Sequence, residues 1–459
     1  MILDNCGIGV DFSPIPGSPA HFRHYLSRFY SLPMITRRSF LKDSTAAAVG
    51  GMLATSALTS RATAQVDASR ILKVGLIGCG GRGTGAAAQA LKADPNVRLT
   101  AMADVFADRL ESSLATLRKV MPARIDVSPA TSFVGLDAFQ KVIDSGVDVV
   151  LLTSTPAFRP QHLKAAIAAG KHVFCEKPVA VDGAGVRSVL ESAAEAKRKG
   201  LSVMSGFCWR YDLRMRETVA KVHAGAIGDI RAILASYHTG TLTTKFPGTR
   251  APGQTDLEWQ LRNWYNFTWL SGDHLVEQAI HNVDKIAWLM KQEMPTQAIG
   301  VGGRSVPAYG NTFDNFSVSY EYASGVRAHL SCRQHDGAYN EVTDYVTGTK
   351  GVFSNGRLAT QGITGETNWK YTGPNKDMYQ VEHDELFAAI RSGKPVNDGV
   401  SMAQSTLMAI MGRMAAYTGQ VVTWDQAMNS KEALVPEKLD WNAPLAVTPR
   451  AMPGQTKLI

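Results

Sequence analysis

A glycine-rich turn between an apolar stretch and an alanine-rich stretch constrains the fold of this chain more than any other feature. Residues 78–83 read Gly-Cys-Gly-Gly-Arg-Gly. Residues 71–77 before them form an apolar run of strand type, and the stretch 86–93 after them favours a helix. A G-x-G-x-x-G turn that joins a strand to a helix is typical of dinucleotide-binding domains.

Each glycine of this turn has a separate physical task. Gly78 permits the tight bend, Gly80 lets a phosphate approach the backbone, and Gly83 allows the helix to pack closely on the strand. The unpaired N–H groups at the start of the helix then face the phosphates. We therefore expect a cofactor diphosphate to contact this turn, through Gly78, Gly80, Gly81, Arg82 and Gly83.

An acidic residue ends the next apolar stretch. Residues 97–103 have strand character and lead into Asp104, which lies 21 residues after Gly83. A carboxylate at this strand end can accept hydrogen bonds from both ribose hydroxyls of NAD and repels the 2′-phosphate of NADP. We therefore favour NAD as the cofactor. Arg82 and Arg109 leave NADP open, because a nearby arginine can accommodate that phosphate.

Strand and helix patterns alternate further along the chain. The near-continuous apolar run 147–153 is typical of a buried parallel strand. A helical stretch at 161–169 and a second strand at 172–175 follow it. This β-α-β order predicts a doubly wound parallel sheet of the Rossmann type, with ligands at the carboxyl ends of its strands. Thr155 and the pair Glu176-Lys177 follow two of those ends.

Length, charge and cysteine spacing limit the class of protein. With 459 residues the chain exceeds what one hydrophobic core usually serves, so two domains are expected. The formal net charge is +8, but Lys and Arg form no long stripe of the kind that follows nucleic-acid phosphates. We therefore expect no nucleic-acid partner. The five cysteines are widely spaced, which predicts neither a disulfide framework nor a metal site.

Residues 1–65 have the features of an export leader. The segment 36–42, Thr-Arg-Arg-Ser-Phe-Leu-Lys, has the pattern of a twin-arginine signal, and Met34 offers a later start. A mildly apolar stretch at 46–58 is too short to span a bilayer, and Ala-Thr-Ala at 62–64 suits cleavage. We therefore expect the twin-arginine machinery to export the folded protein to the periplasm. No membrane span is expected, and the cofactor is expected to stay bound.

The order of several short motifs resembles that of the glucose–fructose oxidoreductase/inositol dehydrogenase (Gfo/Idh/MocA) family. The motifs are the glycine turn, Thr155-Pro156 with His162, Glu176-Lys177-Pro178, the helix 277–284, residues 348–351 and the segment 382–395. The resemblance implies an NAD-dependent oxidoreductase whose cofactor site also includes Thr155, Pro156, His162, Glu176 and Lys177. Taken alone, His162 is more typical of a structural histidine.

The resemblance also implies a second domain with an open, mostly antiparallel sheet, a carbohydrate or polyol substrate between the domains, and a homo-oligomer. The sequence agrees independently with the sheet, because 316–322 and 326–332 alternate around a turn and 230–237 is a further strand candidate. The expected domains are a Rossmann domain at 66–190, a second domain at 191–447 and a tail at 448–459.

Oxidation of a secondary alcohol requires a base for the hydroxyl proton while a hydride leaves. We expect His281 to be this base, and the resemblance assigns to Lys177 the polarisation of the alcohol oxygen. Glu277, His281 and Asp284 are spaced so that a helix presents them on one face, where either acid could orient the imidazole. The family helix often has Asp where this chain has Glu277, which weakens any inference about the substrate.

Aromatic and basic side chains near the motifs are candidates for substrate contact. They are Arg210, Tyr211, Arg262 and Trp264. Aromatic faces can pack against sugar C–H surfaces, and arginine can hold hydroxyl or carboxylate groups. The same side chains can equally belong to the core.

The favoured function is hydride transfer between NAD and a secondary alcohol or hemiacetal of a sugar, glycoside or cyclic polyol. A redox-neutral glycosidase or lyase that acts through a 3-keto intermediate is an alternative, but the Tyr-Pro-Thr-His-type motif associated with such relatives is missing. A non-catalytic nucleotide- or sugar-binding protein is a second alternative. It is disfavoured because Lys177 and His281 are both present.

Overall fold

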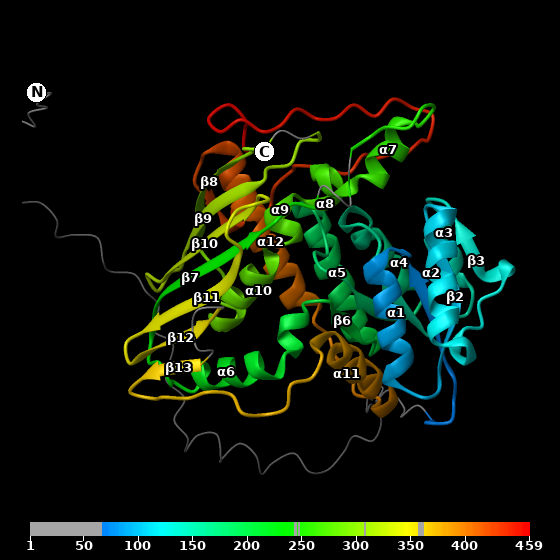
Figure 1. Cartoon of the computed structure of the whole chain (residues 1–459), viewed down its shortest axis with the longest axis horizontal. Coiled ribbons are helices and arrows are strands. Elements are labelled where there is room, and N and C mark those ends of the chain that lie inside the picture. Colours follow the sequence, from blue (N-terminus) through cyan, green and yellow to red (C-terminus); the bar gives the residue numbers. More distant parts are fainter. Residues whose placement is uncertain (1–66, 243–245, 247, 307–308, 357–361) are drawn as a thin grey trace, which may run out of the picture. The chain divides into compact units, whose positions relative to one another are not determined.

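The computed structural model describes residues 67–242, 246, 248–306, 309–356 and 362–459. The expected leader, including the arginine pair, the cleavage site, Cys6 and Met34, lies outside the described residues. Within them, a parallel sheet and its helices come first in the chain, and a second sheet follows (Figure 1).

The first sheet has six parallel strands in the order β3-β2-β1-β4-β5-β6. They are β1 (Leu72–Ile77), β2 (Val97–Asp104), β3 (Ser132–Val134), β4 (Val149–Leu152), β5 (His172–Cys175) and β6 (Val203–Ser205). The strand order reverses between β1 and β4, so the carboxyl ends of these two strands border a crevice, which is where ligands bind in such sheets.

Side chains of these strands pack alternately on the two faces of the sheet. Val74 and Leu76 pack with α1 and α2 on one face, whereas Ile77 and Val150 pack with the helices of the other face. The helices are α1 (Gly81–Ala93), α2 (Ala107–Val120), α3 (Ala138–Asp144), α4 (Arg159–Ala168) and α5 (Gly183–Lys199). The predicted doubly wound sheet is confirmed.

The first domain extends further along the chain than we expected. Strand β6 belongs to the parallel sheet, although it lies beyond residue 190, where the sequence placed the domain boundary. A strand of three residues carries too little periodicity to be seen in the sequence. A late helix, α11 (Met378–Ser392), also packs on this domain, because its Leu386 and Phe387 join the core beneath α1.

The second sheet has eight strands in the order β13-β12-β11-β7-β10-β9-β8-β14. They are β7 (Ile230–Thr239), β8 (Gln297–Gly303), β9 (Asn315–Glu321), β10 (Arg327–Gln334), β11 (Glu341–Gly348), β12 (Gly351–Asn355), β13 (Gly362–Gly365) and β14 (Val422–Thr423). All neighbours are antiparallel except β7 and β10. The expected hairpin is the β9–β10 pair, and the mostly antiparallel sheet is confirmed.

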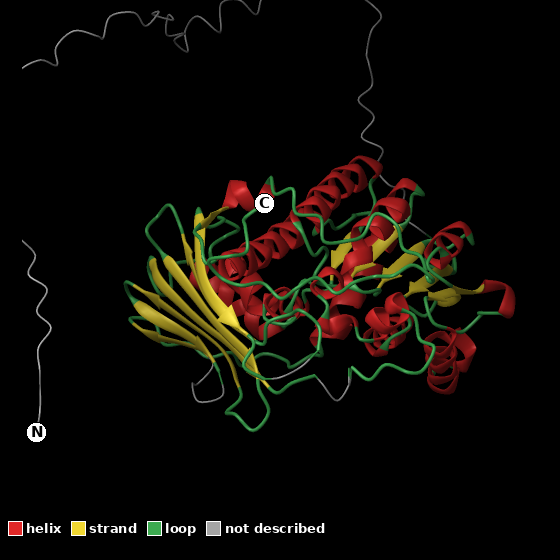
Figure 2. Ribbon diagram, turned by 90° about the horizontal axis from the view of Figure 1, so that it is seen from above, coloured by secondary structure: helices red, strands yellow, loops and turns green. Residues whose placement is uncertain are grey.

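Helices cover one face of this sheet and leave the other face open within the described residues (Figure 2). The remaining helices are α6 (Leu213–His223), α7 (Asp256–Arg262), α8 (Thr268–Ser271), α9 (His274–Glu277), α10 (Ile280–Leu289), α12 (Gly399–Thr418) and α13 (Trp424–Met428). Short 3-10 turns lie at Pro122–Arg124, Pro129–Thr131, Pro156–Phe158, Cys208–Tyr211 and Trp264–Asn266. In the part of the chain that the structure describes, no helix is both long and apolar enough to cross a membrane.

Candidate active site

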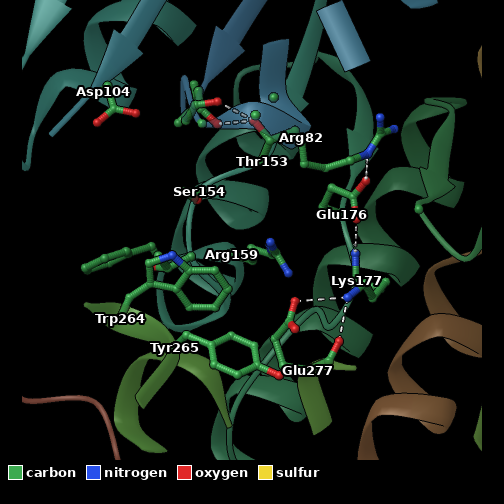
Figure 3. Close-up of a pocket in the computed structure, with 18 of the residues that line it drawn as sticks. Arg82, Asp104, Thr153, Ser154, Arg159, Glu176, Lys177, Trp264, Tyr265 and Glu277 are labelled. Carbon is green, nitrogen blue, oxygen red and sulfur yellow. Dashed lines mark hydrogen bonds and ion pairs between the residues drawn. The ribbon is translucent and has the colours of Figure 1, made fainter. Parts of the chain in front are cut away.

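A cavity of about 1060 Å³ extends from the glycine turn to the start of α10 (Figure 3). It is lined by both domains, which explains why residues 200 positions apart in the chain can act together. Most of the predicted site residues line it, namely Gly78, Gly80, Gly81, Arg82, Gly83, Asp104, Thr155, His162, Glu176, Lys177, Arg262, Trp264, Glu277 and His281. Pro156, Arg210, Tyr211 and Asp284 do not.

The glycine turn has the shape that a dinucleotide diphosphate needs. Gly78 has a φ of +100°, and a Cβ there would lie 2.5 Å from the backbone nitrogen of Ser154. A Cβ on Gly83 would lie 2.0 Å from the carbonyl oxygen of Gly78, so helix α1 can pack this closely only with glycine. At Gly80 and Gly81 a Cβ would meet nothing within 4 Å, which leaves an open approach for phosphate oxygens.

Asp104 ends β2 at the edge of the cavity. Its Oδ2 accepts a hydrogen bond from the backbone N–H of Cys79 at 2.6 Å, and its Oδ1 accepts one from that of Phe106 at 2.9 Å. Burial raises the pKa of the carboxyl above its usual value, while these two hydrogen bonds favour the ionised form. The side chain is therefore fixed at the strand end where a ribose would lie.

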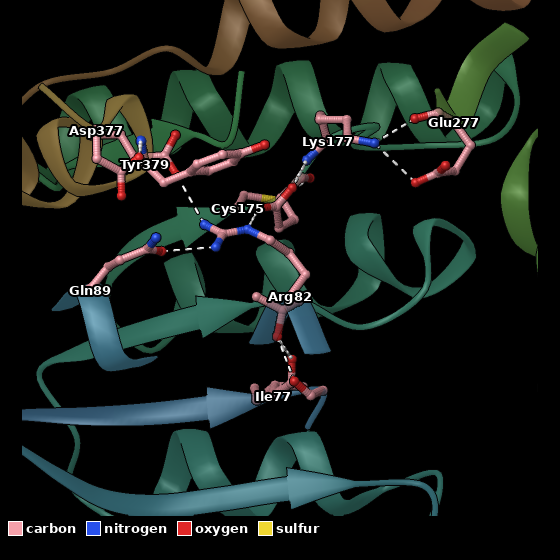
Figure 4. Close-up of polar contacts among 12 residues, drawn as sticks. Ile77, Arg82, Gln89, Cys175, Lys177, Glu277, Asp377 and Tyr379 are labelled. Atoms are coloured by element: carbon pink, nitrogen blue, oxygen red, sulfur yellow. Dashed lines mark hydrogen bonds and ion pairs between the residues drawn. The ribbon is translucent and has the colours of Figure 1, made fainter. Parts of the chain in front are cut away.

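The guanidinium of Arg82 is directed away from Asp104 and is held by two acids (Figures 3 and 4). Its Nε lies 2.5 Å from Oε1 of Glu176, and its Nη2 lies 3.0 Å from Oε1 of Glu382 in α11. The guanidinium also lies 4.9 Å from the ring centre of Tyr379. Burial, followed by the charge of Glu176, raises the pKa of Glu382 well above its usual range. Arg82 is thus occupied far from a ribose 2′-phosphate, which removes one of the two reasons for considering NADP.

The residues after β4 support the cavity wall. Thr155 lines the cavity, whereas Pro156 begins a 3-10 turn and is buried beside it. His162 lies 3.1 Å through its Nδ1 from Oγ of Ser154, and its ring stacks on Phe139 with centroids 4.2 Å apart. Burial lowers the pKa of His162 to about 3, so its imidazole is neutral. His162 therefore holds the loop that borders the cofactor site.

Lys177 and Glu277 form a nearly buried ion pair at the other end of the cavity (Figure 4). The Lys177 ammonium donates to the backbone carbonyl of Glu277 at 2.5 Å and to its Oε1 at 3.0 Å. Gln278 donates to Oε2 of the same carboxylate at 2.7 Å, and Tyr237 donates to the Gln278 amide oxygen at 2.9 Å. Because an ammonium has three N–H donors, one donor of Lys177 remains for a ligand.

The helix that we expected over 277–284 is broken. Helix α9 ends at Glu277, and α10 begins at Ile280 after an intervening turn. Glu277 consequently turns toward Lys177. Within the described residues, neither Glu277 nor Asp284, the next acid along the chain, hydrogen-bonds the imidazole of His281. The expectation that an acid orients this imidazole is therefore wrong.

Asp284 has a structural role in place of the expected catalytic one. Its carboxylate accepts from Nε of Arg210 at 2.9 Å, from Nη2 of Arg210 at 2.8 Å and from Oγ of Ser405 at 2.7 Å. The adjacent Tyr211 donates to Asp398 at 2.8 Å. Arg210 and Tyr211, both expected to contact substrate, are therefore used inside the protein, which corrects those two assignments. An arginine near a motif does not reveal which acid it will meet in the fold.

His281 lies in the cavity wall without a polar partner for its Nδ1 among the described residues. Burial, followed by the positive charges of Lys177 and Lys285, lowers the pKa of the imidazole well below its usual value. His281 is therefore neutral near pH ~7 and can accept a proton, since a neutral imidazole has one free ring nitrogen.

Trp264 and Arg262 both line the cavity, as expected for substrate candidates, but at different places. Trp264 packs edge to face against Tyr265, with ring centroids 5.6 Å apart. Arg262 pairs with Asp108 at 3.2 Å, and its guanidinium lies 3.9 Å from the ring centre of Phe106. Arg262 is thus close to the Asp104 end, where it borders the cofactor.

Other lining residues carried no signal that sequence reasoning used. They include Arg159, Tyr237 and Tyr379. Arg159 lies only four positions after Thr155, so its proximity to that motif could have drawn attention to it. No cluster of His, Cys, Asp or Glu suited to a metal ion occurs within the described residues.

Comparisons with known proteins agree with this geometry. Residues 72–207 match the GFO/IDH/MocA family model described as an oxidoreductase family with an NAD-binding Rossmann fold, and 215–354 match the GFO/IDH/MocA C-terminal domain. An inositol 2-dehydrogenase of Acidiphilium cryptum is 27% identical over 256 residues, which span 56% of this chain but only 65% of that protein. An inositol 2-dehydrogenase of Serratia proteamaculans is 25% identical over 70% of this chain and 87% of its own length.

Solved structures share the fold. The WlbA dehydrogenase of Bordetella pertussis, in complex with NADH and UDP-GlcNAcA, matches with a TM-score of 0.61 and 17% identity over 77% of this chain and 99% of its own. An oxidoreductase of Thermotoga maritima matches with a TM-score of 0.62 and 20% identity over 78% of this chain and 100% of its own.

Proposed function

We propose that this chain, which belongs to the GFO/IDH/MocA oxidoreductase family and has its NAD-binding Rossmann domain, transfers a hydride between NAD and a secondary alcohol or hemiacetal of a sugar, glycoside or cyclic polyol. One observation carries the proposal. A continuous cavity joins the glycine turn and Asp104 to Lys177 and His281. Bound NAD would accept or donate the hydride, and the alcohol would bind in the same cavity beside Lys177 and His281.

Lys177 orients and polarises the reacting oxygen in this proposal. Two of its donors are fixed on Glu277, which sets the direction of the ammonium, and the remaining donor faces the cavity. Negative charge develops on the alcohol oxygen as its proton leaves, and a nearby ammonium stabilises that charge most strongly where water is excluded. The Lys177 side chain is only 11% exposed, so the ammonium acts in such a place.

His281 accepts the hydroxyl proton. Because its imidazole is neutral, it is in the protonation state that a base requires before each turnover. The positive charges of Lys177 and Lys285 also favour release of the proton afterwards. Phe207 packs edge-on against the imidazole, with 6.4 Å between the ring centroids.

Small polyols and sugars are the substrate class that we infer. Inositol 2-dehydrogenases, whose name denotes action on a cyclic polyol, are among the curated relatives. The cavity wall beside Lys177 and His281 also contains Trp264, Tyr265 and Tyr237, whose rings can pack on the C–H faces of a cyclic substrate.

The test is a near-ultraviolet spectrum of the purified protein with NAD and a panel of cyclic polyols, aldoses, sugar acids and glycosides. We expect the reduced-nicotinamide band to grow with at least one compound, and His281→Asn to abolish this growth. His329→Asn is the matched control, because His329 lies on β10 and, in the part of the chain that the structure describes, its ring hydrogen-bonds only Ser317 and Ser319 of β9. Release of an aglycone without any change in the band would replace this proposal with the redox-neutral glycosidase.

We also propose that the folded protein reaches the periplasm by the twin-arginine route. The support is the Arg37-Arg38 segment and the cleavage-type sequence that follows it. Export after folding would let NAD be bound beforehand. Replacing both arginines with lysine should leave the full-length protein in the cytoplasmic fraction, and unchanged export of that variant would refute the route.

A homo-oligomer is the third part of the proposal. The open face of the second sheet exposes Leu234, Ile299 and Val301, and large exposed apolar side chains on one sheet face favour burial against another chain. We expect light scattering to give at least twice the monomer mass. The double variant Leu234→Lys/Val301→Lys should be monomeric. A monomeric wild-type protein would refute the proposed homo-oligomer.

A further inference from the structure

Arg159 is an unusual residue of the active-site cavity, because its charge is buried and has no acidic partner. It begins α4, and the residue is only 5% exposed. Its Nη1 donates to the backbone carbonyl of Pro178 at 2.5 Å, and its Nε is buried with no partner. Within the described residues no carboxylate forms an ion pair with it.

Other deeply buried cations of this protein are treated differently. Lys285 pairs with Asp344, and Arg413 pairs with Glu432. Even the partly buried Arg210 pairs with an acid, Asp284. Burying a charge without a counter-charge is costly, and proteins normally avoid it by pairing. Burial lowers the pKa of the Arg159 guanidinium, and the charges of Glu176 and Glu277 offset this only in part, because neither carboxylate forms an ion pair with it. The missing anion is therefore expected to come from a ligand of the cavity.

The position of Arg159 indicates which ligand this is. Figure 3 places its guanidinium between Ser154 and Glu277, near Lys177 and away from Asp104. The carbonyl that it contacts belongs to the residue directly after Lys177. The phosphates of a dinucleotide, in contrast, have the glycine turn and the start of α1 as their site. The unpaired charge thus lies at the alcohol end of the cavity.

The local charge balance supports the same reading. Lys177 is neutralised by Glu277, and the His281 imidazole carries no charge. Glu176, the other carboxylate that acts on Arg159, is paired with Arg82. Arg159 therefore leaves this end of the cavity with one positive charge that no ion pair compensates. A neutral polyol would leave that charge unpaired, whereas a substrate with one carboxylate would pair it, and arginine is well suited to bidentate carboxylate binding.

We propose that Arg159 binds a carboxylate of the substrate, so that the alcohol oxidised by this protein belongs to a sugar acid rather than to a neutral sugar or polyol. The proposal rests on the proposed function, which it narrows to acidic substrates. The diphosphate of the dinucleotide is the other anion that could pair with Arg159, and the binding experiment distinguishes it from a substrate carboxylate.

The experiment measures binding without turnover, by titration calorimetry on the NADH-loaded protein. The probes are two matched pairs, D-glucuronate with D-glucose and D-galacturonate with D-galactose. We expect at least one acid to bind about 30-fold or more tightly than its neutral partner, as a buried charge pair predicts. Arg159→Met should abolish this preference while changing NADH affinity less than about threefold. Lys164→Met, at an exposed site on the same helix, is the control and should keep it.

Two results would overturn the assignment. One is a wild-type protein without acid preference for either pair. The other is an Arg159→Met variant that keeps the preference but binds NADH at least about tenfold more weakly, which would assign the guanidinium to the diphosphate. The experiment measures only binding, so its result for Arg159 does not depend on turnover. A protein that never reduces NAD would refute the proposed function, and the calorimetry would still show whether Arg159 binds a carboxylate.

Thermal unfolding distinguishes carboxylate binding by Arg159 from a purely structural role of this residue. Methionine replaces an unpaired buried charge with an apolar chain of similar length, so the Tm of Arg159→Met should stay the same or rise. The acid probe should raise the Tm of the wild type and not that of the variant. A Tm lowered by several degrees in the variant, with no acid-dependent rise in the wild type, would make Arg159 a structural residue and contradict the proposal.

Discussion

The ion pair between Lys285 and Asp344 offers a quantitative test of how the structure positions His281. Lys285 lies in α10, one turn after His281, and Asp344 lies on β11. The two side chains are 1% and 0% exposed, and their charged atoms are in direct contact. Asn282 donates to the same carboxylate at 2.9 Å, so the pair and this amide fasten the helix to the sheet.

Breaking the pair from either side should be costly. Asp344→Asn leaves the Lys285 ammonium buried without a counter-charge, and Lys285→Met leaves the carboxylate with amide donors alone. Removal of one partner from a fully buried pair costs ~3–5 kcal/mol of unfolding free energy. The double variant removes both charges and keeps an amide for Asn282, so we expect it to lie within ~1 kcal/mol of the wild type.

Urea unfolding followed by tryptophan fluorescence gives the four free energies of this cycle. A coupling energy of at least ~5 kcal/mol between the two positions is expected, because the double variant avoids the loss that each single variant suffers. If each single variant lost less than ~1 kcal/mol of unfolding free energy, the ion pair would be no stronger than a surface ion pair. That result would contradict the burial of Lys285 and Asp344.

Three further predictions follow from buried and close-packed residues. Burial lowers the pKa of His162 and of His274 to about 3, so the unfolded chain gains protons as pH falls below ~6.5 while the folded protein does not, and stability drops by ~1.4 kcal/mol per pH unit for each histidine. His162→Phe should reduce that slope by ~1.4 kcal/mol per pH unit in acid unfolding curves, and an unchanged slope would mean that the folded histidine is charged. Gly83→Ala should lower the Tm because its Cβ would meet a carbonyl oxygen at 2.0 Å, whereas Gly80→Ala should keep the Tm and weaken NAD binding in a fluorescence titration. Equal Tm values for these two variants would contradict the packing. Asp104→Ser should lower the ratio of NAD to NADP affinity, and an unchanged ratio would show that another residue selects the cofactor.

The local part of the dinucleotide site could be predicted from the sequence because its causes are local. The glycine turn, the strand before it and Asp104 lie in adjacent stretches, and each residue type is dictated by a backbone angle, a close approach or a hydrogen bond. The same holds for the β9–β10 hairpin, where alternation and a short turn determine the pairing.

The remainder of the site depends on contacts between distant segments. The break between α9 and α10 brings Glu277 to Lys177, which lies 100 positions away, and the sequence 277–284 has no proline or glycine that would predict the break. The sequence suggested Arg210 as a substrate residue, because it does not reveal that Asp284, 74 positions away, pairs with Arg210 in the fold. The pairing of Arg82 with Glu382 spans 300 positions and was invisible for the same reason.

The central claim is that one cavity binds NAD through its glycine turn and carries out chemistry through Lys177. The most direct test compares the wild type with Lys177→Met in two measurements, NAD affinity by fluorescence titration and substrate-dependent growth of the reduced-nicotinamide band. We expect an affinity within about threefold of the wild type and a rate reduced by about a thousandfold or more. A variant that still reduces NAD at a near wild-type rate would refute a role of Lys177 in the chemistry, and a variant that loses NAD binding and activity in equal measure would make Lys177 part of the NAD site instead.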